Sequence, residues 1–202
     1  MNTLIIVDFQ NDFAKSNGAL YVKGSEEAYQ NLIDYINKHH NEISDVVFTV
    51  DWHPINHCSF KQYGGVWPEH CVQYSEGAGI PDELIHCVNN YNIDIKFFIK
   101  GNSESAEEYG AFNSVGTFYV HKDDAFITVN NINKNSHLIF NTNNIVVCGI
   151  AGDYCVKNTI KNLLKYDGVI PMNIKVLENC IASIDDGTTI KNFIKENNLK
   201  TI

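Results

Sequence analysis

The sequence predicts an α/β fold built on one mostly parallel, doubly wound sheet with helices on both faces. Two features of the pattern lead to this prediction. Short continuous apolar runs, each bounded by polar residues, are typical of strands buried on both faces. These runs alternate with segments of helical periodicity, and such alternation favours a parallel sheet. The 202 residues are enough for a full core, and we expect a single domain over residues 1–202.

The elements of the N-terminal half follow in chain order. The run TLIIVDF at 3–9 is the first expected strand, because its apolar residues are continuous rather than alternating. In residues 26–40 apolar side chains recur on one helical face, so this segment is the first expected helix. The runs at 45–52 and 93–100 are the next two strands. Residues 53–92 are less regular and are expected to cover one edge of the sheet.

The C-terminal half continues the same alternation. The stretch 113–130 is also less regular and is expected to cover the same edge. The runs at 144–151 and 173–179 are expected strands, and apolar residues between them repeat at helical spacing. A closing helix is expected in 187–198, and residues 199–202 are expected to add a short edge strand.

Composition narrows the class of protein. The formal net charge of −9, with no basic patch, argues against a nucleic-acid partner. The N-terminal apolar run is too short for a signal sequence and contains an acidic residue, and no segment has the length of a membrane span. The six cysteines form no C-x-x-C pair, so we expect reduced thiols. We therefore expect a cytoplasmic protein with no membrane partner.

Chemically active side chains stand where the expected strands end. Ligands of such sheets bind beyond the carboxyl ends of the strands. The first strand ends in Asp8, the second in Asp51 and His53, and the third in Lys100, while Cys155 lies in the turn after the fourth. The sequence therefore predicts a functional site at this edge of the sheet.

Asp8, Lys100 and Cys155 admit two interpretations. The simpler one is an ion pair between Asp8 and Lys100 that joins two strands, since both charges are costly to bury alone. The functional one adds the thiol: Lys100 and a helix N-terminus lower the pKa of Cys155, and Asp8 carries its proton. Backbone amides around Ala151 and Cys155 would then face a developing oxyanion.

A second group suggests a metal site. Residues i and i+2 of a strand point to the same side, so Asp51 and His53 can share one ion, with His70 as a third ligand from a loop. Two histidines and one carboxylate leave coordination positions open; zinc is the favoured divalent ion, and iron and manganese remain alternatives. His57 is near enough to be a fourth ligand, but we expect it to be a solvated loop residue.

Three aromatic residues lie just beyond these strand ends. Phe13 follows the first strand, Trp67 precedes His70, and Tyr109 follows the third strand. Aromatic residues usually belong to a core, but this placement favours a slot for a flat aromatic substrate.

Five motifs, taken in order along the chain, resemble those of one enzyme family. They are IIVDFQNDF, VDWHPINHCSF, VWPEHCVQ, FFIKG and VVCGIAGDYCV. The chain resembles the nicotinamidases (the pyrazinamidase/nicotinamidase group) of the isochorismatase-like cysteine hydrolase family, and the matches extend over nearly its whole length. The resemblance implies the Rossmann-like fold of that family. It also implies a catalytic set of Asp8, Lys100 and Cys155.

The same resemblance implies further features. Asp51, His53 and His70 would hold the metal ion, and a cis peptide would precede Ala151, whose amide would form the oxyanion hole with that of Cys155. The three aromatic side chains would enclose a pyridine ring with its nitrogen toward the metal. The chain departs from the family at one position of the GIAGDYCV turn, where glycine replaces a commoner Thr or Ala, and in the long segment between residues 112 and 144.

The implied reaction is hydrolysis of nicotinamide to nicotinic acid and ammonia through a cysteine thioester, in NAD salvage. Two alternatives stay open. One is a related hydrolase that acts on a different amide or on a vinyl ether, and the other is a non-catalytic protein that binds a metal or a pyridine. The sequence leaves a homo-oligomer possible and does not identify the native metal.

Overall fold

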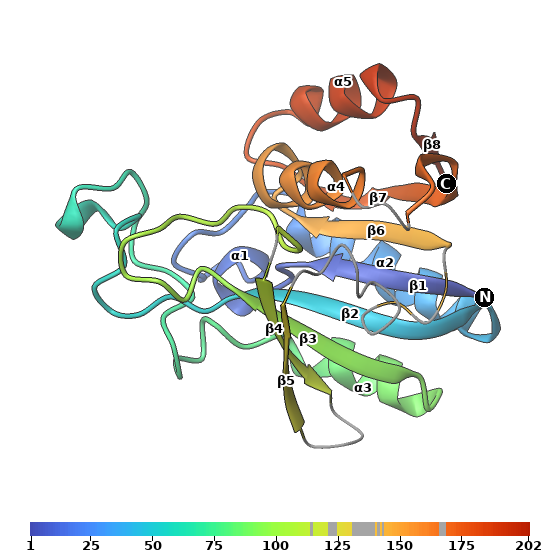
Figure 1. The fold of residues 1–202 in the computed structure, drawn as a ribbon, viewed down its shortest axis with the longest axis horizontal. Helices are drawn as coiled ribbons and strands as arrows, with labels where there is room; N and C mark the ends of the chain where they lie inside the picture. Colours follow the sequence, from blue (N-terminus) through green and yellow to red (C-terminus); the bar gives the residue numbers. More distant parts are fainter. Residues whose placement is uncertain (114, 121–124, 131–139, 141, 143, 166–168) are drawn as a thin grey trace.

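The computed structural model describes residues 1–113, 115–120, 125–130, 140, 142, 144–165 and 169–202. Within these residues, eight strands form one sheet in the order β5-β4-β3-β2-β1-β6-β7-β8 (Figure 1). In this spatial order, every pair of neighbours in the part β3-β2-β1-β6-β7-β8 is parallel. The parallel strands are β1 (Asn2–Val7), β2 (Ile43–Asp51), β3 (Asp94–Lys100), β6 (Ile145–Ile150), β7 (Ile174–Ala182) and β8 (Lys200–Thr201).

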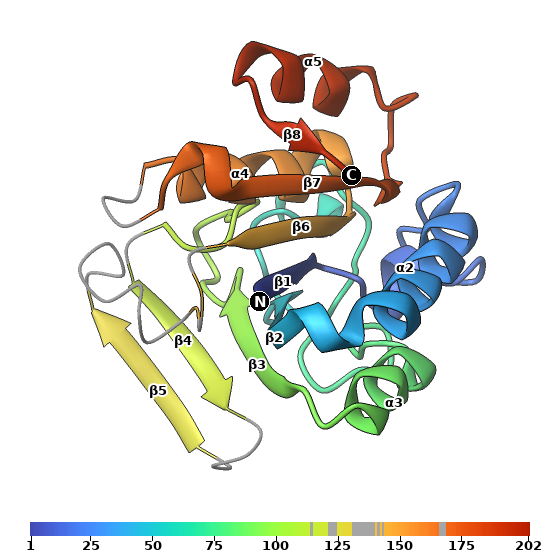
Figure 2. The ribbon, with the colours of Figure 1, turned by 90° about the vertical axis from the view of Figure 1, so that its right-hand side faces the viewer.

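Helices cover both faces of this sheet, as the sequence predicts. Figure 2 shows α2 (Ser25–His39) and α3 (Asp82–Asn90) on one side, with α4 (Lys157–Leu163) and α5 (Thr188–Glu196) on the other. Shorter turns complete the chain: α1 (Asn11–Ala14), η1 (His40–Glu42), η2 (Lys61–Tyr63), the π-helical turn η6 (Gly152–Val156) and η7 (Pro171–Asn173).

The sheet separates the apolar core into two layers, and the central strand β1 contributes side chains to both. Leu4 and Ile6 are fully buried in the same apolar cluster as Leu32 of α2. Ile5, which points to the opposite face, is buried in a second cluster with Ile160 of α4. Because successive side chains of a strand alternate between faces, an unbroken apolar run is what a strand covered on both sides requires. The predicted doubly wound α/β fold is confirmed.

Two expected irregular regions contain regular structure. Residues 53–92 include α3, which packs on a face of the sheet through Leu84 and Val88. Residues 113–130 include β4 (Val115–Val120) and β5 (Ala125–Asn130), which add two antiparallel strands beyond β3. They extend the sheet instead of covering its edge, so that expectation was wrong. The rest of the segment that departs from the family, apart from residues 113, 140 and 142, lies outside the described residues.

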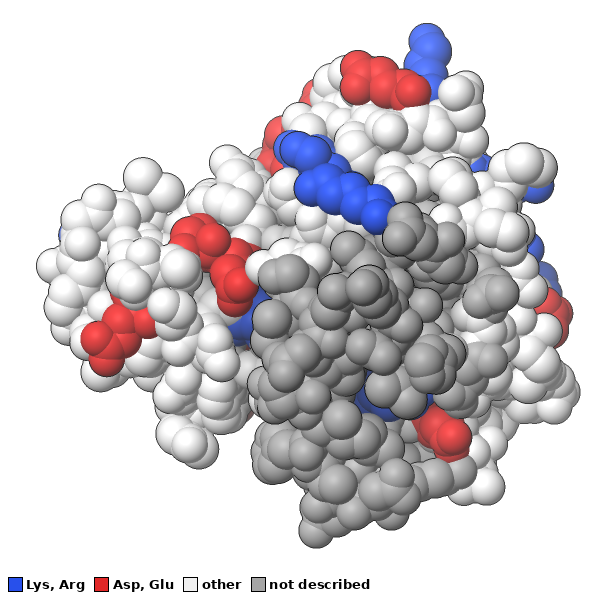
Figure 3. Space-filling view, viewed as in Figure 1, with Lys and Arg blue, Asp and Glu red and all other residues white. Residues whose placement is uncertain are grey.

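Surface charge is distributed in small groups. On the face shown in Figure 3, Lys side chains and Asp and Glu side chains form separate small groups, with a short row of basic side chains in the region of α4. The described part of this face shows no continuous basic surface. Among the described helices, none combines the length and apolar character that a bilayer crossing demands.

The carboxyl ends of β1, β2, β3 and β6 meet at one edge of the sheet. The long connection that follows β2, residues 52–81, projects beyond this edge as the teal segment of Figure 1. The strand-end residues singled out in the sequence therefore lie at the end of the sheet from which this connection projects.

Candidate active site

Asp8, Lys100 and Cys155 meet at this edge. Lys100 Nζ lies 2.8 Å from Asp8 Oδ2 and 3.9 Å from Cys155 Sγ. The thiol sulfur and a carboxylate oxygen of Asp8 lie within 4.8 Å of each other. All three side chains are buried, with exposed fractions of 0%, 2% and 6%. A carboxylate, an ammonium group and a thiol thus lie together in one buried site. Lys100 contacts the thiol as well as Asp8, so the group is more than an ion pair.

The backbone of Asp8 aims its carboxylate across the sheet. Its φ of 46° lies in the left-handed region, which Asp tolerates better than most residues. The Asp8 N–H donates to the Thr49 carbonyl at 3.0 Å, and the Thr49 hydroxyl donates to Asp8 Oδ1 at 2.6 Å. The role of Thr49 was not predicted from the sequence, where the only signal for it is a hydroxyl group inside an apolar strand.

Lys100 also contacts the second carboxylate, at a distance of 2.5 Å between Nζ and Asp51 Oδ1. Burial alone would lower the pKa of Lys100, but Asp51 and Asp8 raise it well above its usual value. Burial would raise the pKa of Asp51, but Lys100 and His53 outweigh burial and hold it below its usual range. Burial raises the pKa of Asp8 in spite of Lys100. Lys100 and Asp51 are therefore charged, and Asp8 is the group best suited to carry a proton.

The thiol is held in its protonated form. Burial raises the pKa of Cys155 well above its usual value, Lys100 lowers it in part, and the carboxylates of Asp8 and Asp51 raise it further. Lys100 thus acts in the expected direction, but burial and the two carboxylates outweigh it, so the expected net lowering of this pKa was wrong for the free protein. Cys155 also lies in η6 rather than at the start of a regular helix, because the Val156 N–H bonds to the Ala151 carbonyl five residues back at 3.0 Å.

The peptide bond between Ile150 and Ala151 is cis, as the family resemblance implies. Ala151 follows β6 directly and, together with Cys155, lines a narrow pocket beneath the long connection. The end of the strand and the thiol therefore belong to the same wall of this pocket.

Asp51, His53 and His70 form a compact set of possible metal ligands. Their ligand atoms lie within 4.8 Å of one another, and all three side chains are buried. His53 and Val72 pair as an isolated bridge, which brings the segment of His70 beside the end of β2. Loop backbone pairing therefore brings His70 to Asp51 and His53, which are already close in sequence.

The two histidines present the right nitrogen atoms for a metal ion. His53 Nδ1 lies 2.8 Å from the Gly101 carbonyl, and His70 Nδ1 lies 2.7 Å from the Pro68 carbonyl. Because a carbonyl can only accept, each Nδ1 carries the proton and each Nε2 has a free lone pair. His53 Nε2 faces the second oxygen of Asp51 at 3.6 Å. The three donors therefore fit a divalent cation.

Buried neighbours hold this ligand set. Gln10 donates to the Asp51 carbonyl at 2.8 Å and accepts the Asp51 N–H at 2.7 Å, so its amide extends the backbone pairing at the end of β2. Gly101 has a φ of 64°, and an added Cβ would lie 2.5 Å from His53 Cε1. Only glycine permits this close approach of the backbone to the imidazole.

His57 is a buried support for His53 and not a solvated residue. Its ring stacks on that of His53 with centroids 4.1 Å apart, and its side chain is fully buried. His57 Nδ1 lies 2.7 Å from Ser59 Oγ, and His57 Nε2 lies 3.1 Å from the Ala106 carbonyl. Both ring nitrogens are thus engaged, which leaves none for a metal ion.

The three predicted aromatic residues line the pocket that opens above Cys155. Trp67 Nε1 donates to the Tyr109 hydroxyl at 3.1 Å, and Phe13 lies against His70 with ring centroids 5.4 Å apart. A fourth aromatic residue, Tyr154, contacts Trp67 edge to face and Tyr109 at a tilt, with centroids 5.2 and 5.3 Å apart. Sequence reasoning missed Tyr154, although its position beside Cys155 was a usable signal.

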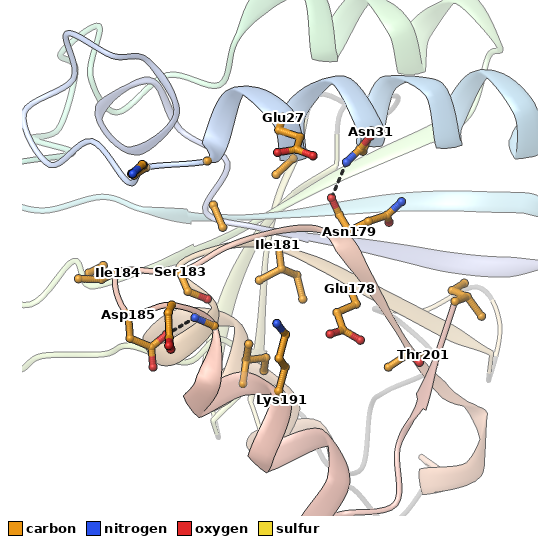
Figure 4. Close-up of a pocket in the computed structure, with 18 residues that line it drawn as sticks. Glu27, Asn31, Glu178, Asn179, Ile181, Ser183, Ile184, Asp185, Lys191 and Thr201 are labelled. Atoms are coloured by element: carbon orange, nitrogen blue, oxygen red, sulfur yellow. Dashed lines mark hydrogen bonds between the residues drawn. The ribbon is translucent and has the colours of Figure 1, made fainter.

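Further pocket residues come from loops with no periodic signal. They are Leu20, Val22, Glu107 and Ile184. A second, wider hollow lies between α2 and α5, and Figure 4 shows the residues Ser183, Ile184 and Asp185 at one end of it. Ile184 lines both spaces, so the segment that follows β7 separates the pocket from this hollow.

Comparisons with known proteins agree on one family. No family model matches the chain. A nicotinamidase of Escherichia coli is 31% identical over 180 residues, which cover 80% of this chain and 76% of that protein. The structure of the yeast nicotinamidase bound to the inhibitor nicotinaldehyde is 26% identical with a TM-score of 0.76, and the match covers 100% of this chain and 99% of that one. The pyrazinamidase of Pyrococcus horikoshii in complex with zinc is 25% identical with a TM-score of 0.74, over 100% and 98% of the two chains.

The order of the motifs, the shared fold and the level of identity point the same way. A relative above 30% identity that matches four fifths of the chain leaves little room for a different family. The chain belongs to the nicotinamidase group of the isochorismatase-like cysteine hydrolases, a group of amide-hydrolysing enzymes.

Proposed function

We propose that this enzyme hydrolyses nicotinamide to nicotinic acid and ammonia through a thioester on Cys155. The observation that carries the proposal is the contact of one buried ammonium group, Lys100, with Asp8, Asp51 and the Cys155 thiol, directly beneath an aromatic pocket. A binding protein would need the pocket but would have no use for a nucleophile beside a proton carrier.

In the first half of the reaction, Asp8 acts as the base and Cys155 as the nucleophile. Asp8 accepts the thiol proton while Cys155 Sγ bonds to the amide carbon, and the carbonyl electron pair moves to oxygen. The raised pKa of Asp8 suits it to hold this proton, and Lys100 stabilises the thiolate as it forms. A thiol that is protonated at rest and loses its proton only when substrate is bound avoids wasteful oxidation.

The tetrahedral intermediate then collapses. The backbone amides of Ala151 and Cys155 would donate to its oxyanion. As the C–N bond breaks, Asp8 returns its proton to the nitrogen, and ammonia leaves. Water next attacks the thioester with Asp8 as the base, the C–S bond breaks, and the thiolate recovers the proton, which releases nicotinic acid.

The donor set of Asp51, His53 and His70 fits a resident divalent ion, and zinc is our proposal for it. Zinc is the ion in the structure of the Pyrococcus pyrazinamidase, and the paired imidazoles and carboxylate suit it chemically. When bound, such an ion supplies a positive centre with open positions for a pyridine nitrogen. Lys100, by its contact with Asp51, orients one of the ligands.

The pocket fits a small, flat, neutral ring. Phe13, Trp67 and Tyr109 supply apolar ring faces, and the narrow space favours one aromatic ring over a longer chain. The yeast relative binds nicotinaldehyde, which has the same ring. In the cell we assign the reaction to NAD salvage in the cytoplasm, and the six free cysteines support a reducing compartment.

The test is ammonia release by the purified, metal-loaded enzyme. Nicotinamide should be hydrolysed, whereas benzamide, which has the same shape but no ring nitrogen, should react far more slowly. Equal rates with benzamide and nicotinamide would contradict the role of the ring nitrogen. Hydrolysis of a non-aromatic amide or a vinyl ether in preference to nicotinamide would overturn the proposal in favour of a related hydrolase.

A further inference from the structure

The turn that carries the nucleophile is joined to the segment that follows β7 by a carboxylate that the reaction does not use. Asp153 lies two residues before Cys155 in η6 and is 7% exposed. Its Oδ1 accepts the Ile184 N–H at 2.9 Å, and its Oδ2 accepts the Asp185 N–H at 3.2 Å. Among the described residues no cationic side chain lies within ion-pair distance of Asp153, so these two amides are the partners of its charge.

These two hydrogen bonds form a clamp, and the two segments that it joins both line the pocket. Cys155, Ala151 and Tyr154 line it from the side of η6, and Ile184 lines it from the segment after β7. Hydrogen bonds from backbone amides to a carboxylate are shorter and stronger than neutral ones. The clamp therefore fixes the distance between the nucleophile and one wall of the pocket.

A second, independent contact shows how closely the two segments approach. A Cβ added to Gly152 would overlap Ser183 Oγ and would lie 2.7 Å from Ile181 Cγ2. The backbone of η6 therefore rests directly on the end of β7 and the residues that follow. On its other side, the same turn presents Cys155 to Lys100 at 3.9 Å.

We infer that Asp153 is a positioning residue for the nucleophile: its carboxylate holds η6 against Ile184 and Asp185 and so sets the placement of the Cys155 thiol relative to Lys100. This inference rests on the proposed function, because it deepens the account of the same site. Asp153 itself touches neither the pocket nor the reacting groups, so it acts through the turn. Figure 4 shows the clamped segment from the side of the hollow, with Ser183, Ile184 and Asp185 at its end.

The test compares Asp153→Asn with Asp186→Asn. In Asp153→Asn the side-chain oxygen can accept one backbone N–H, but the new NH₂ group would face the other, so half of the clamp is lost. Asp186 is the control, because its exposed carboxylate also accepts a backbone N–H, that of Thr188 at 3.0 Å, but its hydrogen bonds are to Thr188 and not to η6. Three quantities are measured in the metal-loaded enzyme: kcat and KM for nicotinamide, the pH profile of Cys155 alkylation by iodoacetamide, and the midpoint of thermal unfolding.

We expect kcat of Asp153→Asn to fall by about 10- to 100-fold, since small misplacements of a reacting group have effects of this size. We also expect its alkylation profile to shift to higher pH as the thiol moves from Lys100. Asp186→Asn should change neither. If Asp153→Asn keeps the wild-type kcat and alkylation profile and loses only thermal stability, the residue is structural and the inference is wrong.

Two precautions keep the outcome decisive. If Asp153→Asn does not fold, Asp153→Ser replaces it, because a small hydroxyl can accept one amide without presenting an opposed NH₂ group, and the same outcomes apply. If the wild-type enzyme does not hydrolyse nicotinamide, the proposed function fails, but the alkylation profile still decides the role of Asp153 because iodoacetamide needs no substrate.

Discussion

Lys100 Nζ lies 2.5 Å from Asp51 Oδ1, so the residue predicted to assist the nucleophile also contacts a predicted metal ligand. The sequence treats these as two separate groups, one for the reaction and one for the ion. In the structure they share one buried ammonium group, which also lies 2.8 Å from Asp8. Removal of Lys100 would therefore leave two buried carboxylates without their common partner.

Cys155→Ala should abolish turnover and leave the fold and the binding of the ring intact, because the thiol supplies a covalent bond and its truncation removes only one heavy atom, the sulfur. Steady-state ammonia release measures the loss, and mass spectrometry of the wild-type enzyme after rapid quenching should find a nicotinoyl adduct on the peptide that contains Cys155. Wild-type activity in the alanine variant would end the hypothesis of covalent catalysis.

Asp8→Asn should lose nearly all turnover, because an amide cannot accept the thiol proton. General acid–base catalysis contributes about 10²–10⁴-fold, and we expect a decrease in kcat within this range. The matched control is Asp45→Asn, which alters a buried carboxylate near the opposite end of the sheet, where it pairs with Lys96 at 3.3 Å. A similar decrease in both variants would show that the loss comes from disturbed strand pairing.

Lys100→Met should raise the pKa of Cys155 further, since Lys100 is the cation that partly offsets burial of the thiol. Alkylation by iodoacetamide requires the thiolate, so its rate should rise with pH above the ordinary thiol range in the wild type and at still higher pH in the variant. Peptide mapping separates Cys155 from the other five cysteines. Overlaid profiles would show that the lysine is only structural.

The same variant should also be less stable, because removal of one partner from a buried ion pair costs about 3–5 kcal/mol. Lys96→Met is its control: Lys96 is a buried lysine of the same strand that pairs with Asp45, far from the thiol. It should lower stability and leave the alkylation profile unchanged. Lys100→Arg keeps the charge but is expected to damage activity through its different shape.

Asp51→Ala or His53→Ala should empty the metal site and weaken binding of nicotinic acid, because the open positions of the ion orient the ring. Elemental analysis of the purified protein measures the metal, and calorimetry measures the ligand. His86→Ala is the control, since His86 is an exposed histidine of α3. An active wild-type enzyme without bound metal would contradict this prediction.

Much of this protein can be predicted from its sequence. Unbroken apolar runs mark β1 and β6, and largely apolar runs mark β2, β3 and β7, because a strand covered on both faces must be mostly apolar. The parallel order then places the strand ends on one edge, which identifies the chemical character of the site. Two elements were missed: α3, which is only nine residues long and lies in a long connection, and β4, which pairs antiparallel with β3.

The tertiary structure decided what depends on distance and burial. Thr49 and Gln10 contact the site through folding of segments far apart in the chain, so no local pattern marks their roles. His57 is buried by its stack on His53, although its loop position resembles that of a solvated residue. The protonated resting state of Cys155 depends on the balance between burial, two carboxylates and one ammonium group. The sequence identifies these groups. Whether together they raise or lower the pKa of Cys155 follows only from where the fold places them, because desolvation energy depends on the depth of burial and Coulomb energy on the distance between charges.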